Sequence, residues 1–506
     1  MKFDRKKNSI RNIILGLLNK CVGLIVPFVI RTLIIQKLGA EYLGLNSLFT
    51  SVLQMLCLSE LGFSSAMIYS MYKPIAEGND DLVCKMLAFY KRMYTYIGLI
   101  VLSLGIFLMP FLKYMIASDY PADINIYVVY LIYLINTTLS YFLFAYKSSL
   151  LNVCLRSDID SLVTTLWNLV MYLIQAVVLL CYSNYYVYAI LLPVTTVFIN
   201  VTRSMAVDWM FPQYRPEGKL EKEYITDIRK KIIGLVGHKL GGVFFSSVDD
   251  IVISSFLGLI ILGKYTNYYY IFNALNGFML VIFQAITAAI GNSLVSESVE
   301  VNQKRYMRLV FINTAVSGWS SICMLCLYQP FMKFWMGTEN MLGLDIAILL
   351  TLYYYIVSVR RVCITYKDAA GMWNEDFGKP YLSVCVNLVV NLILVHLIGL
   401  EGVIISSIAA LVVVEIPWET HVLFSCYFKC SEKMYYCKVL KMTIAFIPIS
   451  LVSFLVTRRF PATFIGLSIQ GLLCTVIFVI MMCVFFRNDI EFRTIRKKYI
   501  SKGDKL

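Results

Sequence analysis

Long apolar stretches, separated by short polar segments, run through almost the whole chain. One helical crossing of a bilayer core needs about 20 apolar residues, and these stretches are far longer than the alternating segments of about 10 residues in a membrane β-barrel. The pattern therefore predicts an all-α polytopic membrane protein with about fourteen transmembrane helices. We expect them at 11–35, 42–70, 94–113, 124–148, 161–182, 185–207, 230–257, 261–292, 308–331, 344–366, 380–398, 402–427, 438–457 and 461–486.

The composition leads to the same class of protein. Of the 506 residues, 59% are hydrophobic when Tyr is counted, and 15% are charged. Soluble domains are about 45–50% apolar and about 25% charged. A soluble surface cannot accommodate so much apolar side chain. The composition excludes a soluble enzyme, a nucleic-acid-binding protein and a disordered chain.

The distribution of basic residues predicts how the chain is oriented. Of the 45 Lys and Arg residues, 36 fall in segments on the side of the N-terminus, 6 on the opposite side and 3 within predicted helices. Basic residues are retained on the cytoplasmic side of membrane proteins. The net charge of +14 is therefore explained by topology and not by a nucleic-acid partner. We expect both termini to be cytoplasmic.

The chain contains an internal repeat with an offset of 219 residues. Between 13–44 and 232–263, ten of 32 positions are identical, including Lys20/Lys239 and three pairs of glycines. Six predicted helices separate the copies, so both run in the same direction, as in transporters built from parallel halves around a midplane site. We expect a six-helix bundle at 1–207, a cytoplasmic linker at 208–229, a second six-helix bundle at 230–428, two further helices at 429–486 and a basic cytoplasmic tail at 487–506.

Charged residues inside the predicted helices are the candidates for function, because a charge at the bilayer centre costs about 2.5–3.5 kcal/mol. Lys20 and Lys239 lie near the midplane, and Arg31 and Asp250 follow them by eleven residues, a spacing that returns to the same helix face. We interpret Lys20, Lys239 and Arg31 as cations that bind a phosphate or pyrophosphate. The alternative is that the lysines bind local carbonyl groups and that Arg31 and Asp250 extend to the membrane interface.

Other ionisable residues are weaker candidates. We assign Asp249, Asp250 and Glu60 as candidate gate or coupling residues, and we add Arg360 and Arg361 as further candidate site residues. Interfacial positions or pairing within loops is the alternative for Glu60 and for the two arginines. Three scattered His and 14 Cys without repeated spacing predict neither a metal site nor a disulfide framework. No nucleophile–base pattern, P-loop or cofactor motif is found, so we expect a protein that is not an enzyme.

Three segments resemble the polysaccharide transporter family, the Wzx-like oligosaccharide flippases. They are the run from QKLGAEYLG to KPIAEGND, the segment GHKLGGVFFSSVDDIVISSFLG, and the run from YKDAAGMWNEDFGK to NLILV. The family is similar to MATE exporters and lipid II flippases within the MOP superfamily. The resemblance implies fourteen helices, with the first and seventh lining a central cavity. Members often carry an acidic-Gln-Arg stretch after the fourth helix, where this chain keeps only Arg156.

The resemblance also implies a substrate, a location and partners. The substrate would be an undecaprenyl-pyrophosphate-linked oligosaccharide repeat unit, moved by alternating access across the bacterial cytoplasmic (inner) membrane for capsule or O-antigen synthesis. We expect a monomer with no cofactor and no nucleic-acid partner, coupled to Na⁺, H⁺ or the membrane potential, working beside a polysaccharide polymerase and chain-length machinery.

Three alternatives remain open at this point. A MATE-type ion-coupled exporter of cationic small molecules would need buried carboxylates in its cavity. A membrane polysaccharide polymerase or ligase would need a large outer loop with catalytic Arg or His, whereas the predicted outer loops are short. The third alternative is a scaffold without transport activity, in which a buried lysine that recurs in both repeats would have no function.

Overall fold

The computed structural model describes residues 5–57, 62–117, 120–372 and 375–494; side chains are not described at 5–10, 13, 230–231 and 233–246. The chain divides into two compact units, residues 1–263 and 264–506. All regular elements of the described residues are helices, as the apolar pattern predicts, and no strand occurs among them. The linker that we expect at 208–229 separates the two sequence repeats and is not a prediction about compact units. It stays a prediction.

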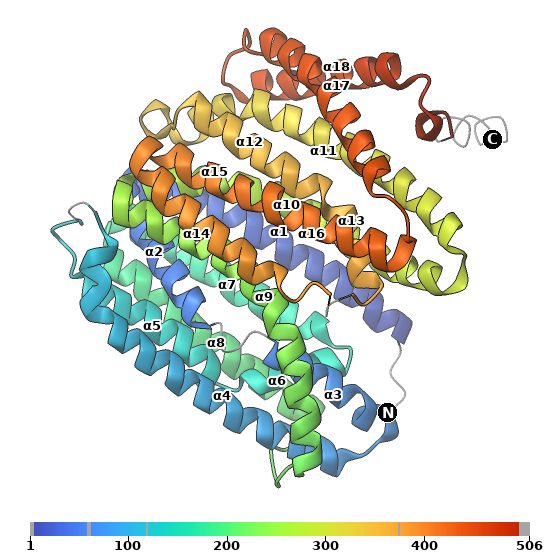
Figure 1. Ribbon diagram of the computed structural model, residues 1–506. Helices are drawn as coiled ribbons and strands as arrows, with labels where there is room; N and C mark the ends of the chain where they lie inside the picture. Colours follow the sequence, from blue (N-terminus) through green and yellow to red (C-terminus); the bar gives the residue numbers. More distant parts are fainter. Residues whose placement is uncertain (1–4, 58–61, 118–119, 373–374, 495–506) are drawn as a thin grey trace. The chain divides into compact units, whose positions relative to one another are not determined.

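The described part of unit 1 contains nine complete α-helices, and helices adjacent in sequence are often adjacent in space (Figure 1). In this unit α4 packs against α5, α7 against α8, and α1 against α7. The elements are α1 (Arg5–Lys37), α2 (Ala40–Leu56), α3 (Phe63–Glu77), α4 (Asp80–Leu108), η2 (Met109–Met115), α5 (Ile126–Phe142), α6 (Ala145–Val153), α7 (Ser157–Cys181), α8 (Tyr185–Met210) and α9 (Lys222–Leu257).

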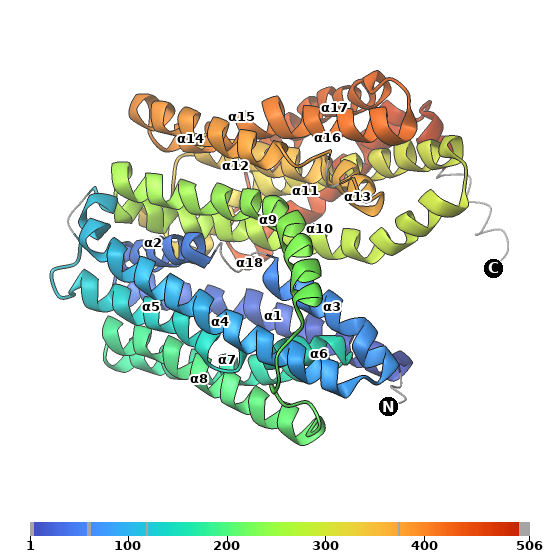
Figure 2. The ribbon, with the colours of Figure 1, turned by 60° about the horizontal axis from the view of Figure 1, so that its bottom comes forward.

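Unit 2 is built on α11, which packs against α12, α17 and α18, while α14 packs against α15 (Figure 2). Residues 400–428 form one helical stretch with two π-helical turns. The elements are α10 (Leu259–Ser296), whose first turn lies in unit 1, α11 (Val299–Met336), η3 (Thr338–Asn340), α12 (Leu344–Val359), α13 (Arg361–Ala369), α14 (Lys379–Ile398), α15 (Leu400–Ala410), η4 (Leu411–Glu415), α16 (Ile416–Val422), η5 (Leu423–Phe428), α17 (Lys433–Thr457) and α18 (Phe464–Phe486).

Side-chain caps and glycines set many of the helix ends. The side chains of Asn79, Asn125 and Asn184 accept hydrogen bonds from main-chain N–H groups in the first turns of α4, α5 and α8, which satisfies donors that have no partner within the helix. Prolines lie inside α1, α8 and α11, and membrane helices tolerate them when neighbouring groups satisfy the freed carbonyls.

The number of membrane crossings agrees with the prediction as far as the described residues allow. Eleven helices are long and apolar enough to cross a membrane, and α5 with α6, bent by 50°, makes a twelfth. These twelve correspond to twelve of the fourteen expected spans. The other two fall on α2 and α3, which flank the undescribed residues 58–61, and on α9, where many side chains are not described. The count of fourteen therefore stays a prediction.

The repeat is visible in the backbone where α1 meets α2 and where α9 meets α10. The repeat-related Gly39 and Gly258 both have positive φ, 120° and 89°, a region that side chains disfavour. About one and a half helical turns further along, Gly44 and Gly263 lie against each other's segment. A Cβ on Gly44 would overlap the Leu259 carbonyl, and a Cβ on Gly263 would overlap that of Ala40.

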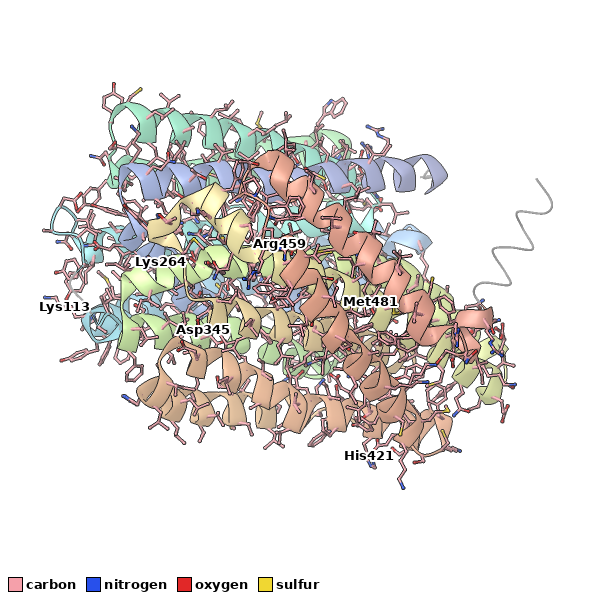
Figure 3. All side chains as sticks on the ribbon, turned by 90° about the horizontal axis from the view of Figure 1, so that it is seen from above. Lys113, Lys264, Asp345, His421, Arg459 and Met481 are labelled. Carbon is pink, nitrogen blue, oxygen red and sulfur yellow. The ribbon has the colours of Figure 1, made fainter. Side chains whose placement is uncertain are left out.

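The two ends of unit 2 can be followed in Figure 3, where Lys264 and Asp345 lie toward one end and His421 toward the other. The predicted position of Lys264 on the side opposite the termini stays a prediction. The core of the unit in the region of α11, α17 and α18 is apolar and includes Phe446 and Phe478.

Candidate functional site

A polar group forms in unit 1 where α1, α2 and α9 meet. Arg31 of α1 is partly buried and interacts electrostatically with Asp250 of α9. The Oδ2 atom of Asp250 accepts a hydrogen bond of 2.6 Å from Ser51 Oγ of α2. The neighbouring Asp249 is buried, with 5% of its surface exposed. The fold thus brings together two residues, Arg31 and Asp250, that occupy equivalent places in the repeat.

Lys20 lies on the same face of α1 as Arg31, because eleven residues correspond to about three turns. Its side chain is exposed, and no hydrogen bond or ion pair within the described part of the chain involves its ammonium group. The adjacent Asn19 accepts a hydrogen bond of 3.0 Å from Thr165 Oγ1 of α7. The helix therefore packs on α7 through its Asn19 side. On this face Lys20 is exposed, and Arg31 interacts electrostatically with Asp250 of α9.

Two predicted site residues fall outside the described residues. Glu60 lies in the undescribed segment 58–61, and Lys239 lies in α9 where the side chains are not described. The proposed pairing of Lys20 with Lys239 across a cavity therefore stays a prediction, as does the assignment of Glu60 to a gate.

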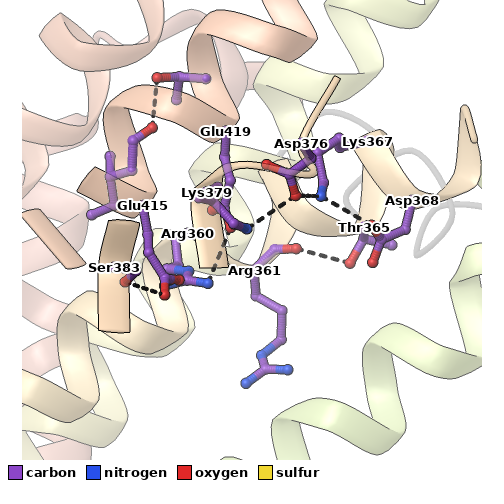
Figure 4. A network of polar contacts seen from close by, with 12 residues as sticks. Arg360, Arg361, Thr365, Lys367, Asp368, Asp376, Lys379, Ser383, Glu415 and Glu419 are labelled. Carbon is purple, nitrogen blue, oxygen red and sulfur yellow. Dashed lines mark hydrogen bonds and ion pairs between the residues drawn. The ribbon is translucent and has the colours of Figure 1, made fainter. Parts of the chain in front are cut away.

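Arg360 is paired inside unit 2. It lies between α12 and α13, and its guanidinium forms ion pairs with Glu415 and, at 3.1 Å, with Glu419 (Figure 4). Only 12% of the Arg360 side chain and 1% of the Glu419 side chain are exposed. Pairing was the alternative considered for Arg360, although its partners come from a helix and not from a loop. Its assignment as a candidate site residue stays a prediction.

The Arg360 pair belongs to a larger buried network at the junction of α13, α14 and α16. Lys379 Nζ lies 2.5 Å from Glu419 Oε1 and 3.1 Å from Asp376 Oδ2. Lys367, which is 2% exposed, also pairs with Asp376. Burial of charges is tolerated when each is paired and hydrogen-bonded. Here the buried cations match the buried anions in number: Arg360, Lys367 and Lys379 against Asp376, Glu415 and Glu419.

Arg361 differs from Arg360 in direction and in partners. In Figure 4 its guanidinium points away from the ion-pair network. Its Nη2 atom donates a hydrogen bond of 2.5 Å to Asn276 Oδ1 of α10, and no ion pair involves it within the described residues. Because the partner is a neutral amide, the positive charge of Arg361 is not neutralised by this contact. Of the two arginines, Arg361 is the one whose charge is left for an anion.

The sequence-based search missed most members of this network. Lys367, Asp376, Lys379 and Glu419 were not singled out, although the run YKDAAGMWNEDFGK places acids and bases alternately between two apolar helices. Such alternation favours local pairing at a helix junction. The spacing of four residues between Glu415 and Glu419, which puts both on one face of a helix, was the second available signal.

Unit 1 has ion pairs at the corresponding helix junction. Asp158, at the start of α7 and 1% exposed, pairs with Arg156 at 2.9 Å and with Arg11 of α1 at 3.4 Å. Arg203 of α8 lies 2.5 Å from Asp160 of α7. Arg156, the one residue retained in the stretch where this chain departs from the Wzx-like pattern, therefore joins α7 to the loop before it.

Comparison with known proteins identifies the family. The sequence matches the model of a family described as "Polysaccharide biosynthesis protein" over residues 9–293, which is more than half of the chain. The chain belongs to this family. A comparison with curated protein sequences gave no match.

Solved structures of transporters share the fold of this polysaccharide biosynthesis protein family member. The lipid II flippase MurJ in an inward closed conformation is 15% identical, with a TM-score of 0.66 over 95% of this chain and 99% of that chain. An inward-facing MATE family multidrug transporter of the MOP superfamily is 13% identical, with a TM-score of 0.64 over 84% of this chain and 99% of that chain. A MOP superfamily transporter from Pyrococcus furiosus is 15% identical, with a TM-score of 0.51 over 85% of this chain and 98% of that chain. The fold is that of the MOP superfamily, as the sequence resemblance implies.

Proposed function

We propose that this protein flips undecaprenyl-pyrophosphate-linked oligosaccharide repeat units across the cytoplasmic membrane for the synthesis of a surface polysaccharide. The family and the shared fold support a membrane transporter of the flippase type. MurJ, which shares this fold, is a flippase of a lipid-linked substrate, lipid II. A pyrophosphate and its sugars cannot cross hydrocarbon without polar groups that replace water.

The observation that carries the proposal is the environment of Lys20. Its side chain is exposed, and it lies on the face of α1 from which Arg31 interacts with Asp250 of α9. A lysine near the predicted midplane, with no partner among the described residues, is costly unless it faces water or an anion. Lys20 would bind the pyrophosphate, with Lys239 as its predicted counterpart in the second repeat.

The distribution of basic residues gives the orientation of the proposed transport path in the membrane. With both termini in the cytoplasm, α1 runs outward from Lys20 to Arg31, so that the Arg31–Asp250 contact lies toward the outer side. Alternating access then requires this contact to rearrange when the site opens outward. An inward-negative potential favours the outward movement of an anion by about 2.3 kcal/mol per charge per 100 mV, and coupling to Na⁺ or H⁺ would add to this. The partners would be a polymerase and chain-length proteins.

A MATE-type exporter of cationic small molecules is the second candidate. The observation that favours it is the pair Asp249 and Asp250, which are acidic and lie in unit 1 beside Arg31. Buried carboxylates can bind a cation or a proton. Asp250, however, already interacts with a cation of the protein and with Ser51, so it is less suited to a cationic substrate than Lys20 is to an anionic one.

The test is a set of Lys20 variants in the native host. We expect Lys20→Ala to cause accumulation of lipid-linked oligosaccharide in the inner leaflet and loss of surface glycan, whereas Lys20→Arg keeps part of the activity because it keeps the charge. Lys91→Ala is the matched control, since Lys91 is also exposed but lies in the expected cytoplasmic part of α4. Normal glycan export by Lys20→Ala at wild-type protein levels would contradict the proposal. Resistance to cationic drugs that is lost in Asp250→Asn but kept in Lys20→Ala would favour the exporter.

A further inference from the structure

We propose that the contact between residues 39–44 and 258–263, which we call the glycine contact, closes the outer end of the transport path and opens during each cycle. The inference rests on the proposed transport function and on the proposed orientation of the chain. It assigns a role to Gly39, Gly44, Gly258 and Gly263, whose recurrence in both repeats is not explained by the charged site residues.

The glycine contact is made by main chain against main chain. A Cβ atom on Gly44 would overlap the carbonyl group of Leu259, and a Cβ atom on Gly263 would overlap the carbonyl oxygen of Ala40 and lie 3.3 Å from the Gly44 nitrogen. Small residues allow membrane helices to approach this closely, because nothing but the backbone lies between them. The first turns of α2 and α10 therefore touch without intervening side chains.

The contact is reciprocal under the repeat. The offset of 219 converts Gly44 into Gly263 and Ala40 into Leu259. The pair Gly44–Leu259 is thereby converted into the pair Gly263–Ala40, and each repeat uses the same two positions against the other. The glycines that begin the two segments, Gly39 and Gly258, also share a positive φ. An accidental approach of two loops would not reproduce this correspondence.

Polar contacts of the outer part of α9 lie behind the glycine contact. Ser254 Oγ donates a hydrogen bond of 2.7 Å to the Met115 carbonyl, and the Ser254 carbonyl accepts one of 2.9 Å from Ala117 N. Ser51, about two turns inward from Gly44 on α2, donates to Asp250. We infer that these three hydrogen bonds break when the outer end opens.

The main-chain contact requires glycine at positions 44 and 263. A methyl group at Gly44 or at Gly263 must push the two segments apart, because a carbonyl group of the backbone cannot move aside as a flexible side chain can. Each of the substitutions Gly44→Ala and Gly263→Ala should therefore shift the protein toward a form open at the outer end. Since both act on the same pair of segments, the double variant should add little to either single one.

The experiment measures access to Ser51 from outside. Ser51→Cys is introduced, and the purified full chain in liposomes is treated with a charged, membrane-impermeant methanethiosulfonate; modification is read on the peptide that contains residue 51, since the chain has 14 native Cys. We expect labelling to be several-fold faster with Gly44→Ala and with Gly263→Ala, to a similar degree. Gly277→Ala is the control, because this glycine of α10 has open space around it, and it should label like the parent.

A second measurement covers the case in which the alanine variants do not fold. Oxidation of Ala117→Cys/Ser254→Cys with copper phenanthroline should join α9 to the segment that its Ser254 carbonyl contacts, stop transport and prevent outer opening, and a reductant should restore both. Equal labelling of the glycine variants and the parent, or full transport by the oxidised double-cysteine variant, would overturn the proposal. The labelling needs no substrate, so its outcome is independent of whether Lys20→Ala shows the protein to be a flippase.

Discussion

Glu419 forms ion pairs with two buried cations in unit 2. Its Oε1 atom lies 3.1 Å from Arg360 and 2.5 Å from Lys379, and its side chain is 1% exposed. Removing one partner from a buried ion pair leaves an uncompensated charge, which costs about 3–5 kcal/mol. Without Glu419, Arg360 would keep Glu415 and Lys379 would keep Asp376, but the buried cations would outnumber the buried anions by one.

We predict that Glu419→Ala lowers the melting temperature in detergent strongly, and that Glu419→Ala/Lys379→Met recovers part of the loss because the excess buried cation is gone. Glu77→Ala is the control, since Glu77 pairs with Lys73 on the surface with 58% and 82% of the side chains exposed, and exposed pairs contribute little. Similar melting temperatures for Glu419→Ala and Glu77→Ala would show that the network does not stabilise unit 2.

Gly39 and Gly258 allow a second prediction at this scale. Their φ,ψ values of 120°,166° and 89°,171° lie in a region open to glycine alone, where another residue costs about 1–3 kcal/mol. Gly78, with 70°,25°, has the left-handed helical conformation that Asn tolerates. We expect Gly39→Asn and Gly258→Asn to lower the thermal stability clearly, and Gly78→Asn to leave it nearly unchanged. Equal effects at the three positions would contradict this interpretation of the backbone.

The sequence could indicate some of these residues and not others. Lys20, Arg31 and Asp250 were found because a charge in an apolar helix is conspicuous and because the repeat aligns them. The members of the unit 2 network were overlooked, since Asp376 and Lys379 stand in a short polar segment between helices, where charge is ordinary. Their burial results from packing of α13, α14 and α16, which no local pattern specifies.

At the scale of elements, an ion pair joins the fifth and sixth expected helices of each repeat. The acidic partner lies on the fifth helix in the first repeat and on the sixth helix in the second. Asp160 of α7 pairs with Arg203 of α8, and Lys379 of α14 pairs with Glu419 of α16. The offset of 219 places Asp160 on Lys379. It places Arg203 on Val422, three residues after Glu419, so the second partner of the pair comes from a neighbouring position of the same helix and not from the aligned one.

This exchange predicts the outcome of a charge swap in unit 1. Asp160→Lys and Arg203→Glu should each destabilise the α7–α8 junction, because each brings like charges together. The double variant Asp160→Lys/Arg203→Glu should recover stability, with an interaction energy of about 0.5–3 kcal/mol. The check is a double-mutant cycle on the free energy of unfolding or the melting temperature, and additive losses would mean that the two side chains do not act as a pair.

The helices themselves were largely predictable, because long apolar stretches need only length and composition to be recognised. Their interruptions were less so. The break between α5 and α6 occurs at Phe144, a non-glycine residue with φ of 57°, and the helix bends there by 50°. Nothing in the run SYFLFAYK signals a break, since no Gly or Pro is present. The bend depends on the contacts of α6 with α3 and α8.

At the scale of the whole molecule, the sidedness of the chain depends on whether α2 with α3 and α9 each cross the membrane. If all fourteen expected spans cross, reporters inserted after Gly78 and after Glu297 should be cytoplasmic, and one after Asp123 should be outside. A green fluorescent protein and alkaline phosphatase pair of fusions measures this. An external Gly78 reporter would mean that α2 and α3 do not form a crossing, and an external Glu297 reporter would mean the same for α9.

The reciprocal geometry of the glycine contact bears on how such a chain arose. When residue i of one copy touches residue j of the other, and j of the first touches i of the second, the interface has the form of a two-fold homodimer. Gly44 with Leu259 and Gly263 with Ala40 satisfy this relation. Two separate six-helix ancestors, inserted in the same orientation, would have made this contact twice at one axis. We infer that fusion of two such copies would leave both halves of this interface in one chain, with Arg31 and Asp250 as equivalent positions of opposite charge.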